Sequence, residues 1–421
     1  MENQISAGRL PRGPIGQIWR PDFHWPDPVL ARQPVGRLIF RSGQLNPYPV
    51  YRDLLAGEPL FPGLYGSVAA ARHDICAGLL ADRRIGAVEG RHGPAAAADL
   101  ADPEFSLLGL NPPDHTRLRR TIMASFSRKQ VTARFGRVKD VVDPLLRRAL
   151  GRGTFDFIEE IAAPVSVGLT RAIFDIPEYC EDELMALGTT VSHSLRGVFS
   201  DAQADVIAAA SRRLKALFEH IITSRSGPGS GDVIGHLLLA RDEGQVTLPE
   251  IIGLCELLVV ASVETTKNVL GNCLLALLSD PSQWQALVAD PTLAGPAFEE
   301  TLRFDPTVQW TWRVALEDIP DIGQGIAKGT NVGLLFGASG RDGSVWDSPD
   351  TFDISRHGPT SHLGFAAGEH YCSGAALARM TSQYLLTELS TMAPTLRMAG
   401  TPKRIMSVPM RGLEGLPVSI D

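Results

Sequence analysis

The sequence predicts a mainly α-helical protein with a small β region. A long apolar run opens at Thr247-Leu248-Pro249-Glu250, a capping box with proline in the first turn, and continues to about Leu278. At about 1.5 Å per residue, a helix over this run would cross most of the molecule. From residue 138 to residue 220 one helical pattern follows another. Short alternating runs, which favour strands, occur at 63–70, 307–313, 332–335 and 404–420.

The composition is that of a globular protein able to bury a large core. The chain has 421 residues, of which 44% are hydrophobic and 21% are charged. A net charge of −7 argues against nucleic acid or an anionic membrane as a partner, because both need a basic face. The five cysteines show no paired spacing and indicate a reducing compartment. The first 50 residues lack an apolar stretch, so we expect no signal peptide, no membrane anchor and a cytoplasmic location.

The predicted organisation is one domain preceded by an arm. Residues 1–45 are punctuated by prolines and are expected to be an extended arm, with a single catalytic domain over 46–421. Asn46-Pro47-Tyr48-Pro49 starts a helix. Residues 83–109 have no periodicity and predict a long loop. The Gly/Ser-rich stretch at 223–231 is too short to separate two domains.

The middle of the long apolar helix carries the polar string Glu264-Thr265-Thr266, preceded by Ala261-Ser262. Threonine hydroxyls bond carbonyls one turn back and open the helical ladder. Glu264 follows apolar residues and is expected to be partly desolvated. An exposed polar patch is the alternative interpretation. An acid beside an alcohol in an apolar helix is suited to relaying protons.

A cysteine between two glycines forms the second candidate site. The string Phe365-Ala366-Ala367-Gly368-Glu369-His370-Tyr371-Cys372-Ser373-Gly374 leads into an amphipathic helix. Backbone N–H groups at a helix start favour a thiolate, which is a soft metal ligand. Gly368 and Gly374 would let the backbone lie against something flat. The alternative is a small, buried, inert cysteine.

Three further patterns contain basic residues. His115 and Arg119 share one face of a helix opened by Pro112-Pro113, where a solvated basic face is the alternative. Glu300 and Arg303 lie three residues apart on a helix, a spacing that alone indicates a surface ion pair of little weight.

The run at 307–313 is a candidate strand. The two-residue period puts Gln309, Thr311 and Arg313 on one side, with Trp310 and Trp312 on the other side and in the core.

Taken in chain order, these motifs resemble those of the cytochrome P450 family. The resemblance covers roughly residues 46–421 and implies a triangular prism of helices, with haem b (iron protoporphyrin IX) between the Glu264 helix and the Cys372 helix. The chain departs from the family pattern at four positions. These are Ser262 and Ala366, where glycine is usual, Ser373, where an apolar residue is common, and Thr381, where glutamate is frequent.

The resemblance implies a role for each motif. Cys372 would bind the iron, and Glu264 with Thr265 would deliver protons to dioxygen. The other cofactor-binding residues would be His115, Arg119, Arg313, Phe365, Gly368, His370 and Gly374. The substrate-binding residues would be Gln309, Ala261 and Leu257. A buried structural triad would comprise Glu300, Arg303 and Arg356. Arg117 and Arg120 would point outward, toward an electron donor.

The activity implied is that of a haem-thiolate monooxygenase. It would insert one oxygen atom from O2 into a small, mostly hydrophobic organic substrate, with electrons from NAD(P)H. The chain has no Gly-rich dinucleotide motif and no ferredoxin-type cysteine cluster, so a separate ferredoxin and ferredoxin reductase are expected. A peroxide-driven peroxygenase, a non-catalytic haem protein and a haem-free helical scaffold are the alternatives. The substrate, and the choice among hydroxylation, epoxidation, demethylation and coupling, are open.

Overall fold

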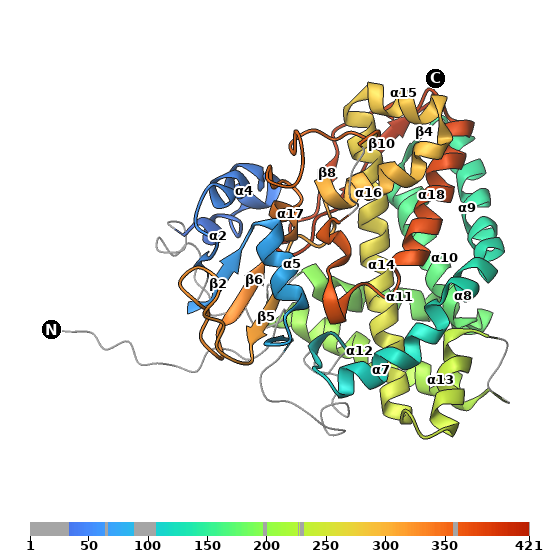
Figure 1. The fold of residues 1–421 in the computed structure, drawn as a ribbon. Coiled ribbons are helices and arrows are strands. Elements are labelled where there is room, and N and C mark those ends of the chain that lie inside the picture. The colour runs from blue at the N-terminus through green and yellow to red at the C-terminus, as the bar shows by residue number, and fades with distance from the viewer. Residues whose placement is uncertain are drawn as a thin grey trace.

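The computed structural model describes residues 33–63, 66–87, 107–196, 200–225, 227, 231–356 and 361–420. Helices form one large region, and a smaller region contains the principal sheet together with the first helices (Figure 1). The prediction of a mainly α fold with a small β region is therefore confirmed.

The helices of the large region cover most of the chain after residue 113. They are α7 (Asp114–Met123), α8 (Arg128–Ala133), α9 (Phe135–Leu150), α10 (Ala163–Phe174), α11 (Glu181–Ser192), α12 (Asp201–Thr223), α13 (Val233–Asp242), α14 (Leu248–Ser279), α15 (Pro281–Ala289), α16 (Ala294–Phe304) and α18 (Ala375–Met392). Short 3-10 helices lie at Leu107–Gly109, Ala124–Phe126, Glu178–Cys180, His193–Arg196, Pro291–Leu293, Leu363–Phe365 and Gly368–His370, and a π-helix lies at Ile158–Ala162.

The strands form three sheets within the described residues. The five-stranded sheet has the order β1 (Phe61–Pro62), β2 (Val68–Ala70), β6 (Asn331–Leu334), β5 (Thr311–Ala315) and β3 (Ile85–Gly86). Only β2 and β6 pair in parallel in this sheet. The other sheets are β4 (Thr154–Asp156), β10 (Pro417–Ser419) and β7 (Arg397–Met398), and the pair β8 (Lys403–Arg404) and β9 (Leu413–Gly415).

Helix α14 is the central element of the helical region (Figure 1). Its start has the predicted capping box: the Thr247 side chain accepts from the backbone of Glu250, and the Glu250 side chain accepts from the backbone of Thr247. Proline stands in the first turn, and the helix ends before Asp280. Because α14 is apolar on most sides, it packs against α10, α11, α12 and α16 at once.

The predicted extended arm is wrong where the structure describes it. Residues 1–32 lie outside the described residues, but α2 (Pro34–Arg37) and α3 (Arg41–Leu45) are short helices. They form because Val35, Leu38 and Ile39 are apolar and pack beside α4 (Tyr48–Leu55) in a small second core. Trp310 and Trp312 belong to the same core, as the sequence predicted.

The Glu300 triad is confirmed as an ion-pair cluster, in which Glu300 and Arg303 are buried and Arg356 is partly exposed. Arg303 donates to both Glu300 oxygens at 2.7 Å, and Arg356 Nε lies 3.2 Å from each of them. Arg303 also donates to the carbonyls of Gly340, Pro349 and Thr351, and its side chain is 2% exposed. A fully bonded, desolvated guanidinium fixes the end of α16 to the segment before the cysteine loop.

No helix in the described part of the chain combines the length and the apolar character that crossing a membrane requires. The remaining short helices are α5 (His73–Ala81), which contacts the cysteine loop, and α17 (Phe336–Ser339), which contacts α4 and α5.

Candidate active site

The cysteine loop, residues 365–374, ends where α18 begins. The Cys372 N–H donates to the Phe365 carbonyl at 3.0 Å and closes the loop. Cys372 packs on a small cluster that contains Val269 of α14, Phe298 of α16 and Ala375. The loop therefore places Cys372 beside a cluster to which α14, α16 and α18 contribute.

The helix start does not by itself make Cys372 a thiolate. Burial raises the pKa of the Cys372 thiol, and the backbone N–H groups of Gly374 and Ala375, together with Arg119 and Arg379, only partly offset that effect. The helix start thus favours the thiolate as predicted, but desolvation of the anion is the larger effect in the protein alone. A bound metal ion deprotonates a coordinating thiol outright.

The small residues of the loop have different roles. Gly368 has φ +65°, and a Cβ there would lie 2.0 Å from the Leu80 carbonyl oxygen, so this glycine is needed where the loop crosses the end of α5. That contact corrects the expectation of a flat partner at Gly368. A Cβ on Gly374 would have only the Cys372 sulfur within 4.0 Å, which leaves that side open. Ala366 has φ 57° and ψ −162°, a conformation that favours glycine.

Two histidines meet beside the loop. His115 of α7 and His370 have ring centroids 4.2 Å apart. His115 is 1% exposed, and its Nε2 has no hydrogen-bond partner among the residues that the structure describes. Burial, with the charges of Arg119 and Arg313, lowers the pKa of His115 to about 4 and that of His370 to about 2.

Two arginines complete this cluster. Arg119 donates to the Ser373 hydroxyl at 3.2 Å and to the Tyr371 carbonyl. Arg313 donates to the Thr311 hydroxyl at 3.0 Å and to the Trp312 carbonyl at 2.7 Å, and burial lowers its pKa to about 10. In the described part of the chain, no carboxylate pairs with either guanidinium.

This cluster of two histidines and two arginines therefore combines two partly desolvated guanidinium groups with a ring nitrogen, His115 Nε2, that has no partner among the described residues. Partly buried guanidinium groups without carboxylates, next to an unbonded imidazole nitrogen, suit an incoming anion such as a pair of propionates. A cysteine thiolate is a suitable haem ligand. The residues present therefore fit haem.

The acid of α14 is enclosed by partners that the sequence did not predict. Glu264 is fully buried, accepts from Arg196 at 2.9 and 3.1 Å, and also binds Lys267 at 2.8 Å and Asn268 at 2.9 Å. Burial raises the pKa of this carboxyl, but Arg196 and Lys267 outweigh burial and hold it below its usual range. Glu264 is therefore ionised and held on three sides.

The threonine beside it is positioned as predicted in one respect. The Thr265 hydroxyl donates to the Ala261 carbonyl, one turn back. The ladder does not open, because α14 runs unbroken through this turn. Ser262, where glycine is usual in the family, lies 2.7 Å from the Thr170 hydroxyl of α10.

Several residues in the middle of α14 keep some exposure, and Leu258, Ser262 and Thr266 are among them. Leu257, Ala261 and Thr265 follow one another at four-residue spacing, and each is partly exposed. Residues four apart share a helical face. These three residues form a stripe that is apolar except for the threonine.

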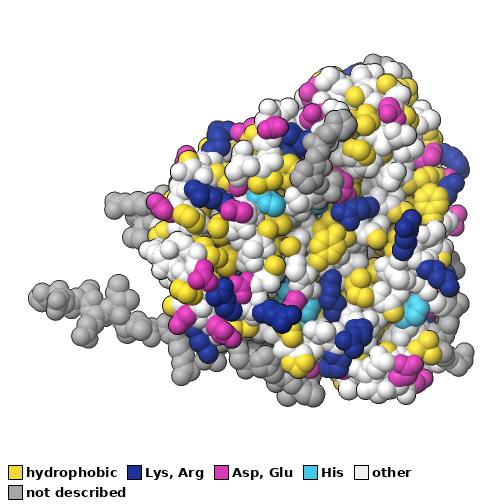
Figure 2. Space-filling view, viewed as in Figure 1, with side chains coloured by type: hydrophobic (Ala, Val, Ile, Leu, Met, Phe, Trp, Pro, Cys, Tyr) yellow, Lys and Arg dark blue, Asp and Glu magenta, His cyan; other side chains and the backbone are white. Residues whose placement is uncertain are grey.

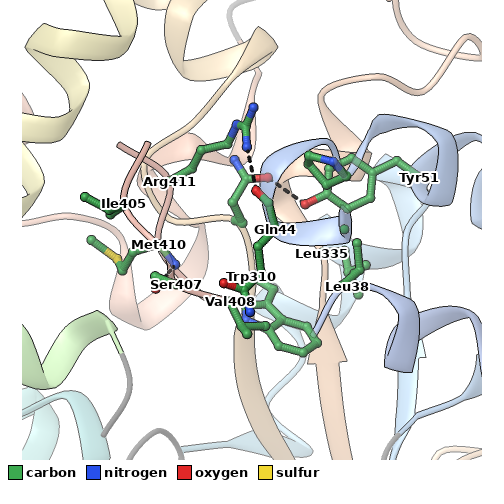
Figure 3. A pocket seen from close by; sticks show the side chains of 13 residues that line it. Leu38, Gln44, Tyr51, Trp310, Leu335, Ile405, Ser407, Val408, Met410 and Arg411 are labelled. Carbon is green, nitrogen blue, oxygen red and sulfur yellow. Dashed lines mark hydrogen bonds between the residues drawn. The ribbon is translucent and has the colours of Figure 1, made fainter. Parts of the chain in front are cut away.

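Gln309 has protein partners for both ends of its amide. Tyr51 donates to its oxygen at 2.6 Å, and its nitrogen donates to the Pro306 carbonyl at 2.6 Å. Gln309 and Trp310 line the same small pocket, whose wall includes Tyr51 and Leu335 (Figure 3). The predicted alternation is wrong here because β5 begins only at Thr311, after both residues. Contact between Gln309 and a substrate stays a prediction.

Arg117 corrects another expectation. It binds the Glu250 carboxylate at 2.6 Å and so joins α7 to the first turn of α14. Arg117 therefore forms an ion pair between two helices and is not part of a surface for docking an electron donor. Arg120, three residues on, is exposed as predicted.

Comparison with known proteins gives one consistent result. The family model "Cytochrome P450" matches residues 292–389, which include Glu300, Arg303 and Cys372. "Cytochrome P450 107B1" of Saccharopolyspora erythraea is 36% identical over 354 residues, or 80% of this chain and 85% of that protein. "Biotin biosynthesis cytochrome P450" of Bacillus subtilis is 31% identical over 389 residues, or 89% and 96%.

The solved structures agree with these sequence matches. P450BioI, in complex with an acyl carrier protein that carries hexadec-9Z-enoic acid, superposes with a TM-score of 0.83 at 29% identity and covers 90% of this chain and 100% of that chain. Fold, sequence and the arrangement of Cys372 with the cationic cluster lead to the same assignment. The chain belongs to the cytochrome P450 family and is a monooxygenase whose cofactor is haem b.

Proposed function

We propose that this chain inserts one atom of O2 into a largely hydrophobic organic substrate bound against the Leu257–Ala261–Thr265 stripe of α14. The observation that carries the proposal is the position of this stripe on α14, the helix that contributes Val269 to the cluster on which Cys372 packs. An apolar wall with one hydroxyl is typical of a site that binds an organic molecule and orients one of its bonds.

In this proposal Cys372 ligates the haem iron, and His115, Arg119, Arg313 and His370 bind its propionates. When bound, a haem with a thiolate ligand supplies dioxygen activation. The remaining loop residues, Phe365, Gly368 and Gly374, shape the loop that presents the sulfur.

Glu264 and Thr265 would bring protons to the reacting oxygen. Glu264 is held by Arg196 and Lys267, so it must loosen one of these cations before it accepts and passes a proton. Thr265 must turn its hydroxyl away from the Ala261 carbonyl for the same purpose. A change in the Arg196 or the Lys267 contact therefore precedes each proton transfer.

The proposed electron donor is an acidic ferredoxin, reduced by an NAD(P)H-dependent reductase. Arg and Lys side chains gather over α7 and α8 (Figure 2), where Arg120, Arg128 and Lys129 are exposed. A basic patch beside the cysteine loop attracts an acidic partner and speeds its encounter at low salt. Arg120→Glu should weaken turnover with such a ferredoxin and leave substrate binding unchanged.

The first substrates to screen are acyl chains. P450BioI, a similar structure, was solved with an acyl group carried by an acyl carrier protein. Fatty acids, both free and carrier-bound, should be compared with unrelated apolar molecules by the spectral shift that they cause on binding. Ala261→Phe, which fills the stripe, should abolish the shift, whereas the exposed surface substitution Arg120→Gln should not.

Turnover tests the whole proposal. Product that contains one atom of labelled O2, formed only with ferredoxin, reductase and NAD(P)H together, is the expected result. Full activity of the purified chain with NAD(P)H alone would refute the need for separate partners. Turnover with peroxide and no reductase, at the same rate, would favour a peroxygenase instead.

A further inference from the structure

A charged cluster that the proposed function does not use joins α16 to the cysteine loop. Glu299 accepts from Arg379 Nε at 2.7 Å and from Arg379 Nη2 at 2.9 Å. His362 Nδ1 accepts from the Gly364 N–H at 3.2 Å, so Nε2 carries the hydrogen and donates to Glu299 at 3.0 Å. Burial raises the pKa of Glu299, but His362 and Arg379 outweigh burial and lower it to about 2.

The Arg379 guanidinium also contacts both ends of the loop that carries Cys372. Its carbon lies 4.8 Å from the centroid of the Phe365 ring, and its Nη1 donates to the Tyr371 hydroxyl at 3.1 Å. Phe365 accepts the Cys372 N–H through its carbonyl, and Tyr371 directly precedes Cys372. One cation thus touches the two residues that fix the backbone of the cysteine.

Uncharged groups and a second ion-pair cluster also hold the described residues around Arg379 in place. The Phe365 ring already has aromatic neighbours, with Phe298 and Tyr371 at 6.2 Å each and His362 at 5.9 Å. The end of α16 is already fixed by the Glu300 triad. A paired cation beside an electron-donating sulfur has an electrostatic consequence, because positive charge stabilises the more negative state of a nearby group and negative charge destabilises it.

We propose that Arg379 is a positioning residue whose charge, balanced by Glu299, sets the electron density at the Cys372 sulfur and with it the reduction potential of the bound haem. The inference rests on the proposed role of Cys372 as the iron ligand. Arg379 favours the reduced state, and Glu299 opposes it. The pair holds the potential between the two values that either charge alone would give.

The test is the reduction potential of the haem-loaded protein, measured by spectroelectrochemistry. Arg379→Gln should lower the potential, and Glu299→Gln should raise it. Each should change the equilibrium constant for one-electron reduction by about threefold or more, which is about 28 mV at 59 mV per tenfold change. The double variant should return close to the wild-type value. A merely structural role would move both single variants in the same direction, because each would loosen the same loop.

Arg117→Gln is the matched control. The Arg117 side chain is 35% exposed against 39% for Arg379, and it too binds a glutamate, Glu250, without contacting the cysteine loop. The reduction potential of the haem-loaded Arg117→Gln variant should equal that of the wild type. Arg379→Lys keeps the charge and should stay closer to the wild type than Arg379→Gln.

The outcomes separate this inference from the proposed function. If the reduced wild-type protein lacks the carbon-monoxide band of a thiolate-ligated haem, the proposed role of Cys372 fails. If that band is normal but the two single variants shift together, or neither shifts, the inference on Arg379 is wrong and the proposed function stands. Should Arg379→Gln fail to take up haem, Glu299→Gln decides alone: a raised potential supports the inference, and an unchanged or lowered one overturns it.

Discussion

Replacing Ala366 by glycine should stabilise the protein. Ala366 has φ 57° and ψ −162°, a region that only glycine occupies without strain. Such strain costs about 1–3 kcal/mol, whereas the extra freedom of glycine in the unfolded chain costs about 0.5–1 kcal/mol. The expected net gain of Ala366→Gly is therefore about 1 kcal/mol.

Urea unfolding of the haem-loaded protein measures this gain. For a chain of this length, the free energy of unfolding is expected to fall by more than about 3 kcal/mol per M of urea. A gain of about 1 kcal/mol should therefore raise the urea midpoint of Ala366→Gly by about 0.3 M or less. Ala367→Gly is the control, because Ala367 has an extended backbone at φ −148° and should lose stability on the same change. If the urea midpoint of Ala366→Gly falls as far as that of Ala367→Gly, the backbone at Ala366 is not strained.

Three further predictions concern buried charges. Glu300→Gln leaves two guanidinium groups without their carboxylate and should lower the free energy of unfolding by about 3–5 kcal/mol, as denaturant titration would measure. The pKa of His115 is about 4 in the folded protein, so the unfolded chain binds more protons below its ordinary value near 6.5. In the haem-free protein, the contribution of neutral His115 to the free energy of unfolding should be complete above a pH of about 6.5 and should be lost progressively toward pH 4. Thermal unfolding measured across this pH range checks this, and His115→Gln should make the dependence on pH flatter. Glu264→Gln should slow product formation by about 100-fold and leave substrate binding unchanged. Arg196→Gln removes one of the two cations that pair with Glu264, so it should raise the pKa of Glu264 and move the acid limb of the pH–rate profile to higher pH. An acid limb that stays in place would show that Glu264 does not control that step.

The features predicted best from sequence depend on local chemistry. Thr247 and Glu250 lie three residues apart, so the start of α14 follows from a pattern that needs no knowledge of the rest of the fold. The cysteine loop is similarly local. The link from Glu300 to Arg356 spans 56 residues, and it was predicted only because the family resemblance supplied it.

The features missed depend on pairing across the fold. Arg196 lies 68 residues from Glu264, and no spacing in the chain indicates which distant cation reaches a buried acid. The Glu299–Arg379 pair spans 80 residues, although one local signal existed: Arg379 follows Cys372 by seven residues and lies near the start of α18, to which the cysteine loop leads. The short helices over 34–45 were missed because their apolar residues gain their partner only when α4 packs beside them.

The account depends most directly on the bond between the Cys372 sulfur and the haem iron. The measurement that tests it is the absorption spectrum of the reduced protein under carbon monoxide, compared between the wild type and Cys372→Ser, with far-UV circular dichroism to confirm that both are folded. We expect the long-wavelength band of a thiolate-ligated haem in the wild type and its loss in the variant, with haem still bound by the histidine and arginine cluster. A folded, haem-loaded wild type without that band, or a variant that keeps it, would contradict the account.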